Sequence, residues 1–217
     1  MTEKVNLDLI SYYHSRAKEY DKIYSKPERQ EELLTISEFI KEIFAGINVL
    51  EIACGTGYWT EKISSSAKLV TAIDVNKNVI KIAEERTRKN RNINYIVSDL
   101  YTFKSEIEYD SLFGGFIWSH IPYEVLDVFI KTVNGFVKPG AEVVLIDNNY
   151  VEGSNTPISH FDDKGNTFQQ RELQDKSRHQ VLKNFHPKEF LRKKLSKYTR
   201  EIKIISLKYY WILCYKV

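Results

Sequence analysis

Five short apolar runs, each followed by a polar turn or an amphipathic stretch, occupy the first two thirds of this 217-residue chain. The runs span residues 47–52, 69–73, 94–97, 111–118 and 142–146. Alternation of this kind is typical of strands that lie parallel in one sheet, with helices packed on both faces. We therefore predict an α/β fold with a Rossmann-like, doubly wound sheet.

The alternation stops after residue 147, and the remaining sequence adds different elements. Two β-compatible runs, residues 167–173 and 177–183, are joined by a polar turn and are predicted to form an inserted β-hairpin. Two final runs, residues 199–205 and 207–215, are connected too tightly for a crossover helix and should pair antiparallel. With the earlier runs they make a predicted sheet of seven strands, mostly parallel.

A glycine-containing turn follows the first run. It reads Glu51-x-Ala53-x-Gly55-x-Gly57 and lies between a strand and a helix. Glycine permits a tight backbone there and allows a ligand to come close to main-chain atoms. In an open α/β sheet, ligands bind at the carboxyl ends of the strands, which is where this turn lies.

Two aspartates end the next two runs. Asp74 follows the second run and is placed to accept hydrogen bonds from a ribose diol. Asp99 follows the third run and is placed to accept from an exocyclic amine such as that of adenine. Because the ends of parallel strands meet at one edge of a sheet, the turn and both aspartates predict a site for an adenosine-containing cofactor.

A nicotinamide dinucleotide is the main alternative cofactor. Its fingerprint needs a third small residue three positions after Gly57, where a helix seats the pyrophosphate. This chain has Thr60 there, preceded by the bulky Tyr58 and Trp59. The crowding disfavours a pyrophosphate, which S-adenosylmethionine does not contain.

Residues 49–60 resemble motif I of the class I S-adenosylmethionine-dependent methyltransferases, with Ala53 where that family often has glycine. Asp74, Ser98-Asp99-Leu100 and Lys138-Pro139-Gly140 resemble later signature positions of the same family. The resemblance covers most of the chain. It implies S-adenosyl-L-methionine as cofactor and S-adenosyl-L-homocysteine as product. The residues that we expect around this cofactor are Tyr20, Glu51, Ala53, Gly55, Gly57, Trp59, Asp74, Val75, Asp99, Leu100 and Trp118.

A narrower resemblance lies in four short segments. It is to a bacterial small-molecule subgroup that includes the phosphonate O-methyltransferase of dehydrophos biosynthesis. The segments are Gly55–Thr60, His120-Ile121-Pro122, Leu173-Gln174-Asp175 and Lys183-x-Phe185. What this resemblance implies is a small substrate that carries an anionic group.

The tyrosine-rich N-terminal segment and the hairpin are the predicted substrate side. Tyr20 is expected to lie closest to the cofactor and to assist catalysis, since a sulfonium favours aromatic faces. Tyr12 and Arg16 belong to the same segment and are expected to contact substrate. Arg171 and Lys183 are expected to bind an anionic group, for which guanidinium and ammonium are suited.

His120 follows the fourth run and is the predicted catalytic histidine. Its side chain titrates near neutral pH and could deprotonate a hydroxyl or orient an acid. Both roles stay open, because an acceptor that is already an anion needs no base. No metal is expected, since the two cysteines, Cys54 and Cys214, have no metal-site spacing.

The predicted function is methyl transfer to a small anionic or hydroxyl-bearing molecule by in-line displacement. Between residues 164 and 203, twelve Lys or Arg stand against four Asp or Glu, within a chain of net charge +3. Because this basic segment could bind nucleic acid, a nucleic-acid methyltransferase stays open as an alternative. A non-catalytic S-adenosylmethionine-binding module is the other alternative.

One domain is expected, since the length suits a single α/β core with an insertion. Its expected parts are an N-terminal helical lid (1–45), a cofactor-binding core (46–147), a substrate-side insertion (148–186) and a closing helix and strand pair (187–217). The chain shows no secretory leader and no apolar run of about 18 residues. A cytoplasmic location, away from membranes, is therefore expected.

Overall fold

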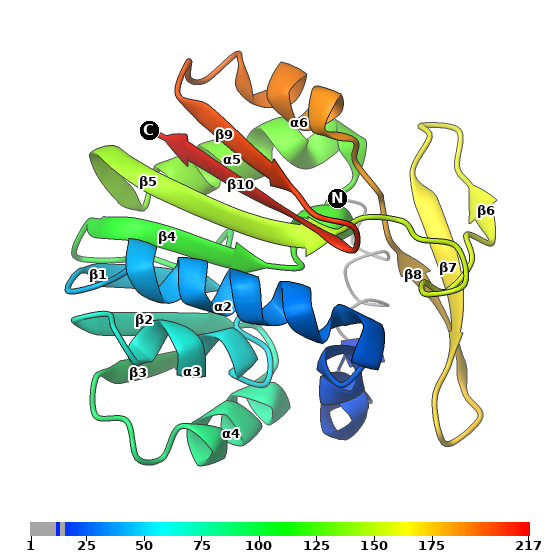
Figure 1. Cartoon of the computed structure of the whole chain (residues 1–217), viewed down its shortest axis with the longest axis horizontal. Helices are drawn as coiled ribbons and strands as arrows, with labels where there is room; N and C mark the ends of the chain where they lie inside the picture. Colours follow the sequence, from blue (N-terminus) through cyan, green and yellow to red (C-terminus); the bar gives the residue numbers. More distant parts are fainter. Residues whose placement is uncertain (1–11, 14–15) are drawn as a thin grey trace.

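The computed structural model describes residues 12–13 and 16–217, without the side chains of residues 17, 18 and 20. Its main sheet has seven strands in the order β3-β2-β1-β4-β5-β10-β9 (Figure 1). The strands are β1 Asn48–Ile52, β2 Leu69–Asp74, β3 Ile93–Val97, β4 Tyr109–Gly115, β5 Val137–Asn148, β9 Ile202–Ser206 and β10 Tyr210–Lys216. Strands β1 to β5 pair parallel, and β10 pairs antiparallel with both β5 and β9. The predicted fold class is confirmed.

Helices cover both faces of this sheet. The helical segments are η1 Ala17–Tyr24, η2 Pro27–Arg29, α2 Gln30–Ile43, α3 Tyr58–Ser64, α4 Lys77–Arg86, η3 Trp118–His120, η4 Tyr123–Val125, α5 Leu126–Asn134 and α6 Lys188–Leu195. Alternate residues of a strand face opposite ways, so Val144 packs with α2 and α3 while Val143 packs with α5 and α6. Each face therefore has its own apolar core.

The strand order reverses beside β1, which pairs with β2 on one side and β4 on the other. Such a switch point opens a crevice at the carboxyl ends of the strands, because the helices that follow neighbouring strands go to opposite faces. The first strand ends at Ile52 and the glycine-containing turn follows it. The fold thus brings this turn to the crevice.

Two strand boundaries differ from the prediction. The fourth strand ends at Gly115 rather than reaching Trp118, because Phe116 has a left-handed backbone (φ 61°) and η3 follows. The fifth strand begins at Val137 rather than after a turn at 138–140, and its register with β4 shifts between Tyr109 and Ser111. An apolar run alone does not show where its backbone leaves the sheet.

The inserted hairpin is confirmed. Strands β7 Thr167–Glu172 and β8 Arg178–Leu182 pair antiparallel, and a two-residue strand that was not predicted, β6 His160–Phe161, joins them in a second sheet. Figure 1 shows this small sheet beside the main one, at the end where η1 lies. Among the described residues, no helix combines the length and apolarity that crossing a membrane requires.

Candidate functional site

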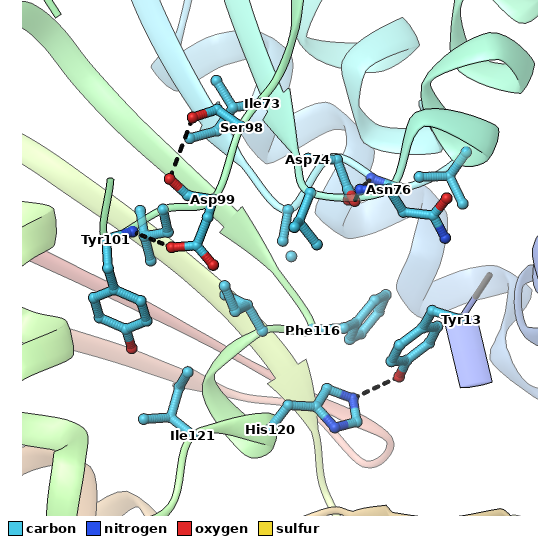
Figure 2. Close-up of a pocket in the computed structure, with 17 residues that line it drawn as sticks. Tyr13, Ile73, Asp74, Asn76, Ser98, Asp99, Tyr101, Phe116, His120 and Ile121 are labelled. Carbon is cyan, nitrogen blue, oxygen red and sulfur yellow. Dashed lines mark hydrogen bonds between the residues drawn. The ribbon is translucent and has the colours of Figure 1, made fainter. Parts of the chain in front are cut away.

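A cavity of about 180 Å³ opens at the carboxyl ends of β1 to β4, and we call it the strand-end cavity. In Figure 2, Asp74 and Asp99 lie on one side of it, and His120 and Tyr13 lie on the other. Of the residues predicted from the sequence, it is lined by Ala53, Gly55, Asp74, Val75, Asp99, Leu100 and His120. Residues from four separate strand ends therefore meet around one space.

The glycine-containing turn owes its shape to left-handed backbone at three positions. Ala53, Gly55 and Gly57 have φ values of 51°, 57° and 78°. A Cβ at Gly57 would lie 2.8 Å from the Cβ of Ala83, so Gly57 allows close packing against α4 rather than lining the cavity. Ala53 takes a conformation that costs a non-glycine residue about 1–2 kcal/mol, and the fold accepts this cost.

Asp74 braces the same turn. One of its carboxylate oxygens accepts from the Gly55 amide at 2.9 Å, and the other accepts from the Asn76 amide at 2.8 Å. Burial raises the pKa of Asp74, and both backbone hydrogen bonds act against that rise. Asp99 is held in a similar way, because its Oδ1 accepts from the Tyr101 amide at 2.8 Å. Each carboxylate keeps further acceptor capacity for a ligand.

His120 is buried and its tautomer follows from its two contacts. Nδ1 lies 2.6 Å from the carbonyl oxygen of Leu182, which can only accept, so Nδ1 carries the proton. Nε2 lies 2.7 Å from the Tyr13 hydroxyl and therefore accepts from it. Burial and the charge of Lys183 hold the pKa of His120 well below its usual range. The ring is neutral at physiological pH, with the lone pair of Nε2 turned toward Tyr13.

A buried ion pair stands behind this histidine. Lys183 and Asp147 are 5% and 0% exposed at their side chains, and Nζ lies 2.9 Å from Oδ1. Lys183 also donates to Ser119 Oγ at 2.5 Å, and Asp147 accepts from the Ser119 amide at 2.8 Å. Burial lowers the pKa of Lys183, and the charge of Lys183 offsets burial to lower the pKa of Asp147. Through Ser119, the ion pair connects η3 to the residue that follows β8.

A second cavity, of about 310 Å³, adjoins the first, and we call it the polar cavity. Tyr13, Phe116 and His120 line both cavities, so they mark the junction. Of the predicted substrate residues, it is lined by Tyr12, Arg16, Arg171 and Lys183. Phe116 reaches this junction with the left-handed backbone noted above, a strain that is commonest at functional sites.

Arg171 is a partly buried cation on this wall. Its guanidinium donates to Gln169 Oε1 at 2.6 Å and to the Tyr12 hydroxyl at 3.4 Å. It has no carboxylate within ion-pair distance in the part of the chain that the structure describes. Lys183, by contrast, directs its ammonium at Asp147 and Ser119, which was not foreseen from the sequence. Of these two predicted cations, Lys183 is thus paired with an acid, whereas Arg171 has no such partner among the described residues.

Several predicted residues lie elsewhere. Glu51, Gly57, Trp59 and Trp118 are buried outside the lining of either cavity. Trp59, for example, packs its ring edge against Gly115 in the core. Tyr20 belongs to η1, but its side chain lies outside the described part. The cofactor and catalytic roles of these residues stay predictions.

Three residues at the junction or directly behind it were missed from the sequence. Tyr13 lies in the tyrosine-rich segment, where nothing distinguished it from its neighbours. Asp147 is the last residue but one of β5, as Asp74 is the last of β2, so the rule that selected Asp74 and Asp99 applied to it as well. Phe116 carries no chemical signal, and only its backbone conformation sets it apart.

Glu51 is a buried acid beside the turn, and its ionisation should be visible in folding stability. It is 1% exposed, burial raises its pKa to about 8, and its Oε2 has no hydrogen-bond partner in the described structure. An acid with a raised folded pKa loses its stabilising contribution as pH rises from the unfolded pKa to the folded one. Relative to wild type, Glu51→Gln should therefore gain stability between pH 5 and pH 8, by at most about 1.4 kcal/mol per pH unit.

Urea unfolding at several pH values measures this difference. The gain should level off above pH 8, where both states of the wild type are ionised. A difference that is independent of pH would show that Glu51 is ionised throughout.

Comparison with known proteins agrees with this geometry. Residues 49–140 match the family model described as a methyltransferase domain. The full chain superposes on the structure of a DhpI complex with S-adenosylhomocysteine, with a TM-score of 0.82 and 24% identity over 99% of this chain and 97% of that one. Residues 49–140 are thus similar to a methyltransferase domain, and the chain shares the fold of the DhpI complex over nearly its whole length.

Other methyltransferases match with less similarity. N-methyltransferase NodS from Bradyrhizobium japonicum superposes with a TM-score of 0.62 and 15% identity, over 88% of this chain and 97% of that one. Demethylmenaquinone methyltransferase of Staphylococcus aureus is 30% identical over 108 residues, which are 48% of this chain and 44% of the relative. A malonyl-[acyl-carrier protein] O-methyltransferase of Ilyobacter polytropus is 28% identical over 49% of this chain and 41% of its own length. The match thus spans less than half of these curated relatives.

Proposed function

We propose that this chain transfers a methyl group from S-adenosyl-L-methionine to a small anionic or hydroxyl-bearing molecule by in-line displacement. The observation that carries the proposal is the meeting of two cavities of different chemistry at Tyr13, Phe116 and His120. One cavity is lined by strand-end acceptors and the other by cations. A methyl donor in the strand-end cavity and a methyl acceptor in the polar cavity would meet at the junction of the two.

The strand-end cavity suits this cofactor. Asp74 and Asp99 offer acceptors for a ribose diol and an adenine amine, while Leu100 and Ile121 add apolar walls. Gly55 leaves its backbone open to a ligand. When bound, the cofactor supplies an electrophilic methyl group on a sulfonium.

The chain's own residues then act on the acceptor. Arg171 holds an anionic group. His120 takes the proton of an acceptor hydroxyl at Nε2, the ring nitrogen with a lone pair, when that hydroxyl replaces the Tyr13 hydroxyl there. The walls of both cavities position the reactants and exclude water, which accounts for roughly 7–11 kcal/mol of barrier reduction in well-oriented reactions.

The direct test is a screen for S-adenosylhomocysteine release. The chain is incubated with S-adenosylmethionine and with small carboxylates, phosphonates and phenols, and an RNA arm runs beside them. Release that depends on a small acceptor supports the proposal. Release with RNA alone supports the nucleic-acid alternative, and cofactor binding without any turnover supports the non-catalytic one.

Replacing Asp74 should weaken cofactor binding. For Asp74→Ala we expect a loss of about 1.5–3 kcal/mol, the magnitude of a charge-assisted hydrogen bond, or roughly ten- to hundredfold in dissociation constant. Calorimetric titration with S-adenosylhomocysteine measures it.

Asp110→Ala is the matched control for this titration. Asp110 also accepts a backbone hydrogen bond, from Asn48 at 2.9 Å, but at the amino end of the sheet. Its loss should leave cofactor affinity unchanged. Equal affinity of wild type and Asp74→Ala would contradict the placement of the cofactor.

A further inference from the structure

The polar cavity contains two separate groups of charged side chains. The first lies on the hairpin side, where Arg171 and Lys183 line the cavity and the buried Asp147 pairs with Lys183 from behind. Asp147 compensates Lys183, so among the described residues this group keeps one uncompensated positive charge, on Arg171. An uncompensated guanidinium in a desolvated site is costly unless an anion accompanies it.

The second group lies where η2 meets the loop after β5. Arg29 is 5% exposed, and its Nε and Nη2 donate to Ser154 Oγ at 3.2 and 2.9 Å. Lys26 donates to the backbone carbonyl of Ser154. Neither cation has a carboxylate within ion-pair distance among residues 12–13 and 16–217. Glu28, the nearby acid, accepts from Ser154 Oγ at 2.8 Å, so this group also carries a net charge of one.

The other acids of the cavity do not neutralise these cations. Glu172 pairs with Lys176 and Arg178, at 3.4 and 3.3 Å, both on its own hairpin. Glu19 lies 3.8 Å from Lys22, which neighbours it on η1. The cavity therefore keeps an excess of positive charge at two places.

Arg171 and Arg29 line the same cavity. Burial lowers the pKa of Lys183, and the charges of Arg171 and Arg29 lower it further. Burial and the charge of Arg29 also lower the pKa of Lys26. Gln169 links the two walls. Its Oε1 accepts from Arg171 at 2.6 Å, and its Nε2 donates to the carbonyl of Thr156, while the preceding Asn155 accepts from Arg29 at 3.4 Å.

We propose that the acceptor of this chain carries two anionic groups, one bound by Arg171 beside His120 and the other by Lys26 and Arg29 at Ser154. This inference rests on the proposed function and narrows its substrate class to small dianions such as dicarboxylates. Lys26 binds the second anionic group and therefore distinguishes dianions from monoanions. Arg171 binds the first group, which both classes carry.

The test is calorimetric titration of the chain saturated with S-adenosylhomocysteine. Succinate and glutarate are compared with butyrate and valerate, which have the same chain lengths and one carboxylate less, at fixed ionic strength. At least one dicarboxylate should bind roughly tenfold more tightly than its matched monocarboxylate. Lys26→Met should abolish that preference without changing monocarboxylate affinity, and Arg171→Met should weaken both classes.

Lys188→Met is the control, since it removes the same charge from an exposed position on α6 that lines neither cavity and should change neither affinity. Equal binding of mono- and dicarboxylates, no binding of any dicarboxylate, or a preference that survives Lys26→Met would overturn the inference. Saturation with S-adenosylhomocysteine is measured first. A chain that fails to bind it contradicts the proposed function, whereas normal binding without a dianion preference contradicts only this inference.

Discussion

Replacing Lys183 by methionine should lower the free energy of unfolding by about 3–5 kcal/mol at neutral pH, the cost of leaving a buried partner charge unpaired. Lys183 Nζ lies 2.9 Å from Asp147, and the Asp147 side chain is fully buried. Without Lys183, burial would raise the pKa of Asp147 and favour its protonation. The loss should therefore be smaller at pH 5 than at pH 7, because the neutral acid needs no partner.

A double variant distinguishes the stability lost with the ion pair from the stability lost with the packing of the lysine side chain. Asp147→Asn with Lys183→Met removes both charges and should recover most of the stability, as replacement of a whole buried pair usually does. Urea unfolding of the wild type, both single variants and the double variant forms a complete cycle. A double variant as unstable as Lys183→Met alone would show that packing of the lysine stem, and not the ion pair, is what matters.

The second large effect is expected at His120. His120→Asn keeps a donor for the Leu182 carbonyl but removes the acceptor that faces Tyr13. If His120 is the general base, kcat should fall by roughly 10²–10⁴ for a hydroxyl acceptor. Affinity for S-adenosylhomocysteine should stay within twofold of wild type, to within roughly 0.4 kcal/mol.

The pH profile gives an independent readout. A base works in its unprotonated form, and burial with the Lys183 charge holds the pKa of His120 well below its usual range. The wild-type rate should therefore show no loss as pH falls from 8 to about 6.5, the ordinary histidine value. An inflection near that value would show that the pKa of His120 is not lowered. A variant that changes KM while kcat is kept would assign His120 to orienting the acceptor instead.

The strand ends were predictable because their chemistry repeats along the chain. Asp74 and Asp99 each follow an apolar run, and parallel strands bring such ends to one edge of a sheet. The inserted hairpin and the antiparallel closing pair followed in the same way from run length and tight connections. The local pattern of apolar runs and connections was sufficient to predict these features.

The junction was not predictable, because its contacts join residues far apart in the chain. Tyr13 and His120 are 107 residues apart, and Lys183 and Asp147 are 36 apart. The sequence alone predicts that Lys183 binds an anionic substrate group. Nothing local shows that an acid near the end of β5 faces it. Burial and partner choice are tertiary properties that periodicity does not encode.

The end of β8 has a consequence for how such a protein diversifies. Leu182 sets the proton position on the His120 ring, Asn184 donates to the Ser119 carbonyl at 2.8 Å, and Arg171 comes from the paired strand β7. Residues 167–184 thus carry both the carbonyl that fixes the His120 tautomer and the guanidinium that we propose binds an anion. Grafting that segment between homologous scaffolds would transfer these two contacts together and leave the strand ends around the strand-end cavity unchanged.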